Sequence, residues 1–158
     1  MDPHKLTIKS QEAIAKAQAI LTEKNQQELR AEHLLLALLQ QEESIIKPLF
    51  QKLGLAVDGL IKEIELEVDK IPSVVGGQMY LSQDFQKVLL QAEKEAKALG
   101  DEYVSTEHLL LALLEVSRQM RDILLNYQID KDKILRAMKE IRGSQKVTDQ
   151  NPESKHQV

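Results

Sequence analysis

An internal repeat constrains this chain more than any other feature of its sequence. The octapeptide EHLLLALL at residues 32–39 recurs without change at residues 107–114, an offset of 75 residues. The same offset pairs Thr7 with Ser82 toward the N-terminus, and an offset of 74 extends the match toward the C-terminus. Eight identities in a row, within a longer match, indicate that one structural unit of the chain is duplicated.

Apolar residues in both copies are spaced as on one face of an α-helix. The octapeptide is apolar all round, which predicts a helix buried as the core of its own half. Aromatic residues make up only 3% of the chain, and the abundant Leu, Ala, Glu and Lys favour helix over strand. We expect four helices per copy, at about 7–23, 31–41, 45–53 and 57–70, then 82–99, 106–116, 118–127 and 131–142. The predicted fold class is all-α, with two pseudo-symmetric four-helix repeats packed into one globular domain of about eight helices.

Capping residues and helix breakers divide the chain at the same places as the periodicity. Thr7 and Ser82 precede apolar-periodic segments and are predicted N-caps. Glycines follow three of the expected helices, where they favour helix termination. The segment 72–78 contains Pro and paired Gly, and is expected to connect the two copies as a hinge.

Domain boundaries follow from these signals. Residues 1–143 form the predicted duplicated domain, with repeat one at about 6–71 and repeat two at about 81–143. Residues 144–158 are polar and bury too little to fold alone, so we expect a linker toward a domain that is missing here.

The sequence carries no recognisable catalytic or cofactor-binding motif. It lacks the GxxxxGK[ST] and GxGxxG patterns that bind phosphates, and it has no Cys for thiolate chemistry. His4, His33, His108 and His156 lie too far apart in the sequence to suggest a metal site. We expect His33 and His108, which are duplicated with the octapeptide, to be structural. The chain is therefore predicted to be no enzyme and to bind no cofactor and no metal.

Charge and hydropathy argue against two classes of partner. The formal net charge is -4, spread over segments of mixed sign, and gives no basic stripe for nucleic acid. No stretch approaches the roughly 20 apolar residues that span a bilayer, so no membrane partner is expected. The N-terminus lacks the features of a secretory signal. Together with the absence of Cys, these features favour a cytoplasmic location.

Two copies of a four-helix unit, each with the octapeptide EHLLLALL, resemble the Clp N-terminal repeat domain of the Clp ATPases. The resemblance covers residues from about Leu6 to Arg142. The segment 100–107 and especially the tail 141–153 are most similar to the ClpB-type disaggregases of that family. The resemblance implies a domain ahead of two ATPase modules, so that residues 144–158 would lead to a missing ATPase module that binds ATP.

The resemblance also implies candidate binding residues. In the similar domains, a polar cluster that matches Thr7, Asp101 and Glu107 is associated with binding of substrate polypeptides. This cluster lies beside an apolar groove, one position of which matches Leu89. Leu90 is a candidate by its own pattern, because it lies roughly 140° from the buried stripe of its helix and would be exposed.

Each candidate also has a structural explanation. Thr7 is a good N-cap, and Glu107 lies in the first turn of a helix, where the helix dipole favours a carboxylate. Both positions keep a similar residue in the other copy, whereas Asp101 corresponds to Gln26. The repeated fold should therefore not require a carboxylate at position 101, which makes Asp101 the strongest functional candidate. Leu90 and Leu66, which is similarly off its helix's stripe, could be ordinary surface leucines.

The expected function is weak, sequence-tolerant binding of unfolded or aggregated client polypeptides. The resemblance implies that clients pass to a hexameric ATPase ring in cooperation with the DnaK chaperone system. Hexamer formation would depend on the missing ATPase modules, and the isolated domain is expected to be monomeric. Two alternatives remain open at this point: an adaptor-docking domain of a ClpA- or ClpC-type unfoldase, and a structural spacer.

Overall fold

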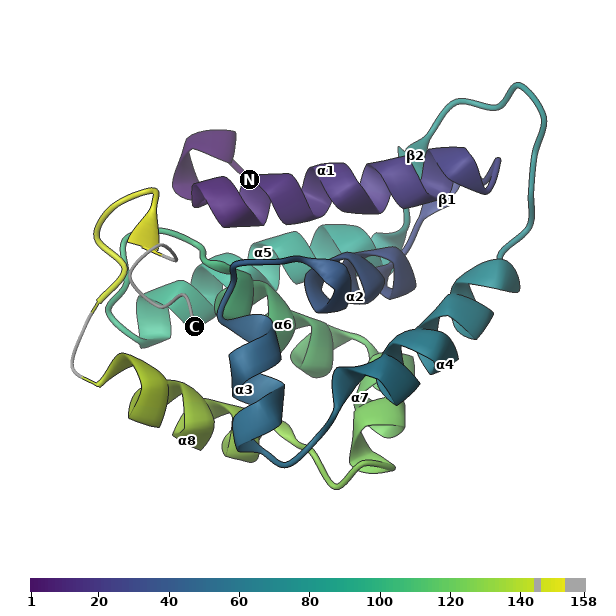
Figure 1. Ribbon diagram of the computed structural model, residues 1–158. Helices are drawn as coiled ribbons and strands as arrows, with labels where there is room; N and C mark the ends of the chain where they lie inside the picture. Colours follow the sequence, from purple (N-terminus) through teal and green to yellow (C-terminus); the bar gives the residue numbers. More distant parts are fainter. Residues whose placement is uncertain (144–145, 153–158) are drawn as a thin grey trace.

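The structure, a computed structural model, describes residues 1–143 and 146–152 (Figure 1). In this part of the chain it is mostly helical, with two strands of two residues each, which confirms the all-α prediction. Each predicted helix is present, and its bounds differ from the expected ones by two residues at most. The elements are η1 (Pro3–Lys5), α1 (Ile8–Glu23), β1 (Glu28–Leu29), α2 (Ala31–Gln40), α3 (Ile46–Lys52), α4 (Val57–Asp69), β2 (Tyr80–Leu81), α5 (Gln83–Ala98), α6 (Thr106–Val116), α7 (Arg118–Leu125) and α8 (Lys131–Arg142).

The helix ends use the predicted capping residues. The Thr7 side chain accepts a hydrogen bond from the Ser10 backbone N–H, and Ser82 likewise accepts one from Phe85. Gly54, Gly100 and Gly143 follow α3, α5 and α8 closely, with φ of +82°, +74° and +61°. Glycine adopts this left-handed backbone without the steric cost that other residues incur, so these residues stop the helices locally.

The two octapeptide helices lie at the centre of the molecule (Figure 1). All nine residues from Ala31 to Leu39 in α2 are buried, as are those from Thr106 to Leu114 in α6. The two helices contact each other, and each also contacts the long first helix of the other copy. A single hydrophobic cluster contains residues of both copies. The octapeptide helices are therefore the core of both halves together, rather than each of its own half.

Short backbone pairings cross from one copy to the other. Strand β1 pairs in parallel with β2, with Leu29 opposite Leu81, and Leu6 forms a parallel bridge with Val104. At the offset of 75 residues, Leu6 corresponds to Leu81 and Leu29 to Val104. The two pairings are thus the same contact, related by the pseudo-symmetry of the repeat. Segment 72–78 consequently connects two interlocked parts of one body and does not act as a hinge.

Residues 146–152, which we call the strap, differ from the polar linker expected over 144–158. Val147 is only 3% exposed. Its carbonyl accepts a hydrogen bond from the Glu102 N–H (2.8 Å), and the Gln150 carbonyl accepts one from the Ile8 N–H (2.7 Å). The strap docks although it is polar, because backbone groups make these bonds. Residues 144–145 and 153–158 of the predicted linker lie outside the described residues, and a continuation toward an ATPase module remains a prediction.

Candidate functional site

A groove of about 820 Å³ lies between α5, the loop 101–104 and the N-terminal segment. Its apolar lining includes Leu90, which is 59% exposed, and Val104. Side chains of both signs line it as well, among them Lys94, Lys97 and Glu93 from α5. An apolar surface with charges of both signs suits weak contact with polypeptides of varied sequence, because no single charge pattern is required.

Among the exposed residues of this groove, the sequence predicted Leu90 but not the residues beside it. Lys94 and Lys97 follow Leu90 by four and seven residues, which places them on the same helix face. The helical spacing could therefore have identified them. Tyr103 also lines the groove, and it gave no signal of its own because it lies in a loop. Leu89 is partly buried, packs against the core and does not line the groove.

Thr7 helps to hold the loop 101–104, which lines the groove. Its side chain is buried, and its hydroxyl donates to Ser10 Oγ (3.0 Å). The Ser10 hydroxyl in turn donates to the Val104 carbonyl (2.8 Å), while the Val104 N–H donates to the Lys5 carbonyl (2.7 Å). The start of α1 is thereby tied to the loop that lines the groove.

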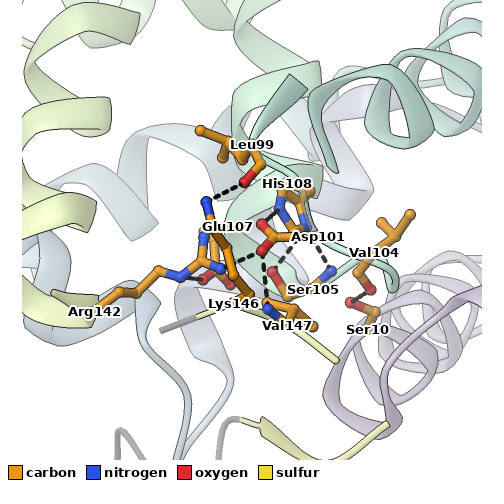
Figure 2. Close-up of polar contacts among 10 residues, drawn as sticks. All are labelled: Ser10, Leu99, Asp101, Val104, Ser105, Glu107, His108, Arg142, Lys146 and Val147. Carbon is orange, nitrogen blue, oxygen red and sulfur yellow. Dashed lines mark hydrogen bonds and ion pairs between the residues drawn. The ribbon is translucent and has the colours of Figure 1, made fainter. Parts of the chain in front are cut away.

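Asp101 is the centre of a buried polar cluster (Figure 2). Its carboxylate accepts hydrogen bonds from His108 Nε2 (2.7 Å), Arg142 Nη2 (2.7 Å) and the Val147 backbone N–H (2.9 Å). The Asp101 side chain is 0% exposed, so the groove is lined only by its main chain. Burial alone would raise the pKa of Asp101, but the bonds from His108, Arg142 and Val147 outweigh it and hold the pKa at about 2.

Glu107 belongs to the same cluster but is less well satisfied. It is 3% exposed, and its Oε2 lies 3.8 Å from Arg142 Nε. Its Oε1 has no hydrogen-bond partner in the described part of the chain. Thr7, Asp101 and Glu107 are thus all buried near the strap, whereas Leu90 is exposed in the groove. As binding residues they remain predictions.

The two duplicated histidines have the structural role that the sequence predicted. His33 Nδ1 accepts a hydrogen bond from the Arg30 N–H (2.9 Å), and His108 Nδ1 accepts one from the Ser105 N–H (2.8 Å). Each ring therefore carries its proton on Nε2, which donates to the side chain at position 26 or 101. Gln26 and Asp101 thus occupy equivalent places beneath the two octapeptide helices.

Residues 1–143 and 146–152 contain neither a metal-binding cluster nor a membrane-spanning helix. In these residues, no group of three or more His, Cys, Asp or Glu side chains could hold a metal ion. None of the helices described is long and apolar enough to cross a membrane.

Comparison with known proteins gives consistent matches. The family model described as the Clp repeat (R) N-terminal domain matches residues 5–128. The chaperone protein ClpB of Bacillus cereus is 37% identical over 163 residues, covering 100% of this chain and 19% of that protein. ClpB of Nitratidesulfovibrio vulgaris is 38% identical over 165 residues, with the same two shares. This chain therefore spans about a fifth of the length of the curated relatives it matches.

Solved structures share the fold. The Hsp104 N-terminal domain from Candida albicans matches with a TM-score of 0.84 and 25% identity, covering 95% of this chain and 99% of that one. The N-terminal domain of the ClpV1 ATPase from E. coli matches with a TM-score of 0.76 and 25% identity, covering 94% and 90%. The matching model describes an N-terminal repeat domain and not an ATPase module, in agreement with the prediction that this chain is not the enzymatic part. The sequence match and the fold together show that this chain belongs to the Clp repeat N-terminal domain family.

Proposed function

We propose that this chain engages unfolded or aggregated polypeptides through the groove beside α5 and hands them to a hexameric, ATP-dependent chaperone ring. The observation that carries the proposal is Leu90, an apolar side chain 59% exposed within a groove of about 820 Å³. An exposed leucine costs little by itself, but one that lies in a groove of mixed polar and apolar lining offers area to an apolar client segment. The ring, its ATP and cooperation with the DnaK system belong to the proposal, as does a cytoplasmic location.

Weak binding suits this task. A client held tightly could not be passed on, and several tethered weak sites in a ring raise the effective concentration without strong individual contacts. Lys94, Lys97 and Glu93 would add contacts of either sign. Salt screens such exposed charges but not the apolar contact of Leu90. Client binding should therefore weaken only moderately at high ionic strength.

The test is a titration of the chain with an unfolded apolar peptide, followed by backbone amide NMR shifts. Leu90→Ala is compared with Leu66→Ala, because Leu66 is also an exposed helical leucine (63%) but lies on α4, outside the groove. We expect shifts around the groove and a Kd raised about fivefold by Leu90→Ala, the effect of losing roughly 1 kcal/mol of apolar contact. Leu66→Ala should leave the Kd unchanged.

Other outcomes would favour the alternatives. Equal effects of the two leucine variants would show that the groove is not the binding surface. No shift at millimolar peptide would leave an adaptor-docking domain or a structural spacer as the better explanation. An adaptor-docking domain would instead bind one folded partner stoichiometrically.

A further inference from the structure

Three residues that line the groove also bind the strap. Asp101, Glu102 and His4 line the groove. The same residues hold the strap: Asp101 accepts from the Val147 N–H (2.9 Å), the Glu102 N–H donates to the Val147 carbonyl (2.8 Å), and the His4 carbonyl accepts from Gln150 Nε2 (3.0 Å). Any displacement of the strap therefore acts directly on residues that a ligand in the groove would contact.

The carboxylate of Asp101 faces away from the groove. Its side chain is 0% exposed, and its bonds go to a helix-start histidine, to Arg142 and to the strap (Figure 2). A client in the groove cannot reach this carboxylate while the strap is docked. Any influence of Asp101 on the groove must then pass through the loop 101–104.

The other repeat shows what position 101 is for. There, Gln26 Nε2 donates to the carbonyls of Val68 (2.7 Å) and Ile71 (3.3 Å), and Gln26 forms a bridge with Ser73. Gln26 thus holds the segment that follows α4, just as Asp101 holds the segment that follows α8. An amide serves where the partners are carbonyls, and a carboxylate serves where they are an N–H and a guanidinium.

This equivalence corrects the argument drawn from the repeat. The carboxylate at position 101 is explained by the docking of its own post-helix segment, and binding of a client is not needed to account for it. Val147, which is 3% exposed, is an apolar anchor of that segment.

We propose that Asp101 is a positioning residue of the groove: by holding the strap it fixes the loop 101–104, and a bound polypeptide senses Asp101 only through that loop. The part of this inference that concerns a bound polypeptide rests on the proposed function. The coupling between strap and groove does not, so the two can fail separately.

The first experiment uses the full chain without peptide. Val147→Asp places a charge at the buried anchor and should release the strap, whereas Thr148→Asp adds the same charge at the next, exposed position and should not. We expect amide exchange at Glu102 to rise at least about tenfold in Val147→Asp, because its acceptor leaves. Amide shifts of Tyr103 and Lys97 in the groove should change in the same variant. Val147→Ala should shift the same amides less, and it replaces Val147→Asp if that variant unfolds.

The second experiment adds the unfolded apolar peptide and a double-mutant cycle. Asp101→Asn and Val147→Asp should each raise the Kd about fivefold, and the double variant should be no weaker than either single one, because both act through the strap. An Asp101→Asn effect that persists undiminished in the Val147→Asp chain would overturn the proposal, since Asp101 would then act on the peptide directly. Release of the strap with unchanged groove shifts would overturn it as well. If the wild-type chain binds no peptide, the proposed function fails, and the peptide-free shifts still decide the coupling.

Discussion

The imidazoles of His33 and His108 each serve two partners at the start of a central helix. In the neutral ring one nitrogen accepts and the other donates. Nδ1 takes the backbone N–H that the helix start leaves unpaired, and Nε2 donates to position 26 or 101. A Glu or Gln side chain commonly takes the first of these two roles at the third position of a helix. The second role explains a histidine there, because it links the helix start to the residue that holds the post-helix segment.

Stability should depend on pH through His33. Burial lowers the pKa of His33 from 6.5 to about 4. Above pH 6.5 the ring is neutral in both the folded and unfolded states, but as the pH falls toward 4 only the unfolded chain gains the proton. The free energy of unfolding should therefore fall by roughly 3 kcal/mol from this residue over that range.

Urea unfolding of His33→Gln at a series of pH values tests this expectation. Gln keeps a side-chain acceptor for the Arg30 N–H and does not titrate. As the pH drops from 6.5 to 4, the free energy of unfolding of the wild type should fall relative to that of the variant. Parallel pH profiles would show that His33 is protonated equally in both states.

At the scale of elements, local signals predicted the helices well because their causes are local. The apolar stripe, the Thr7 and Ser82 caps and the glycine stops each act within a few residues, and they placed all the helix bounds within two residues. Strands β1 and β2 have two residues each, too few for an alternating pattern. They exist because the two copies bring their backbones together, which no single segment of sequence encodes.

The candidate site was predicted only in part, because part of it depends on contacts between segments far apart in the sequence. Leu90 was placed correctly on an exposed face, since helical periodicity decides that question. The burial of Asp101 depends on the strap, whose composition resembles a solvated linker. The docking is made by backbone groups, by the side chains of Asp101 and Gln150, and by the buried Val147 and Pro152. The available signal was the equivalence of the segments after α4 and α8, which an offset of 74 residues would have suggested.

Gly54, which lies between α3 and α4, and Gly59, which lies within α4, should respond oppositely to alanine. Gly54 has φ of +82°, whereas Gly59 lies within α4, and an added Cβ would meet no heavy atom within 4 Å at either position. Backbone conformation alone therefore separates them. Gly54→Ala should destabilise by about 1 kcal/mol, and Gly59→Ala should stabilise by about 0.5–1 kcal/mol. Thermal melts of both variants check this, and equal signs would contradict it.

At the scale of the whole molecule, the pseudo-symmetric pairings make each repeat incomplete without the other. Leu6 of repeat one forms a bridge with Val104 of repeat two. In the equivalent pairing, β2 of repeat two lies against β1 of repeat one. The octapeptide helices then bury a common core. A unit of about half this length alone would bury a smaller fraction of its surface and be only marginally stable. Neither repeat should therefore remain folded after the other has unfolded.

Equivalent core leucines provide the test of this cooperativity. Leu35 and Leu110 are related by the repeat and are both 0% exposed. Leu35→Ala and Leu110→Ala should each lower the free energy of unfolding by about 3 kcal/mol, since each removes a fully buried side chain and leaves a cavity. In both variants, hydrogen exchange should show amides of α2 and α6 losing protection together, because unfolding is one transition. If Leu35→Ala instead exposed α2 while α6 stayed protected, the repeats would be separate folding units, and the cross-repeat pairings would be a contact made after each had folded.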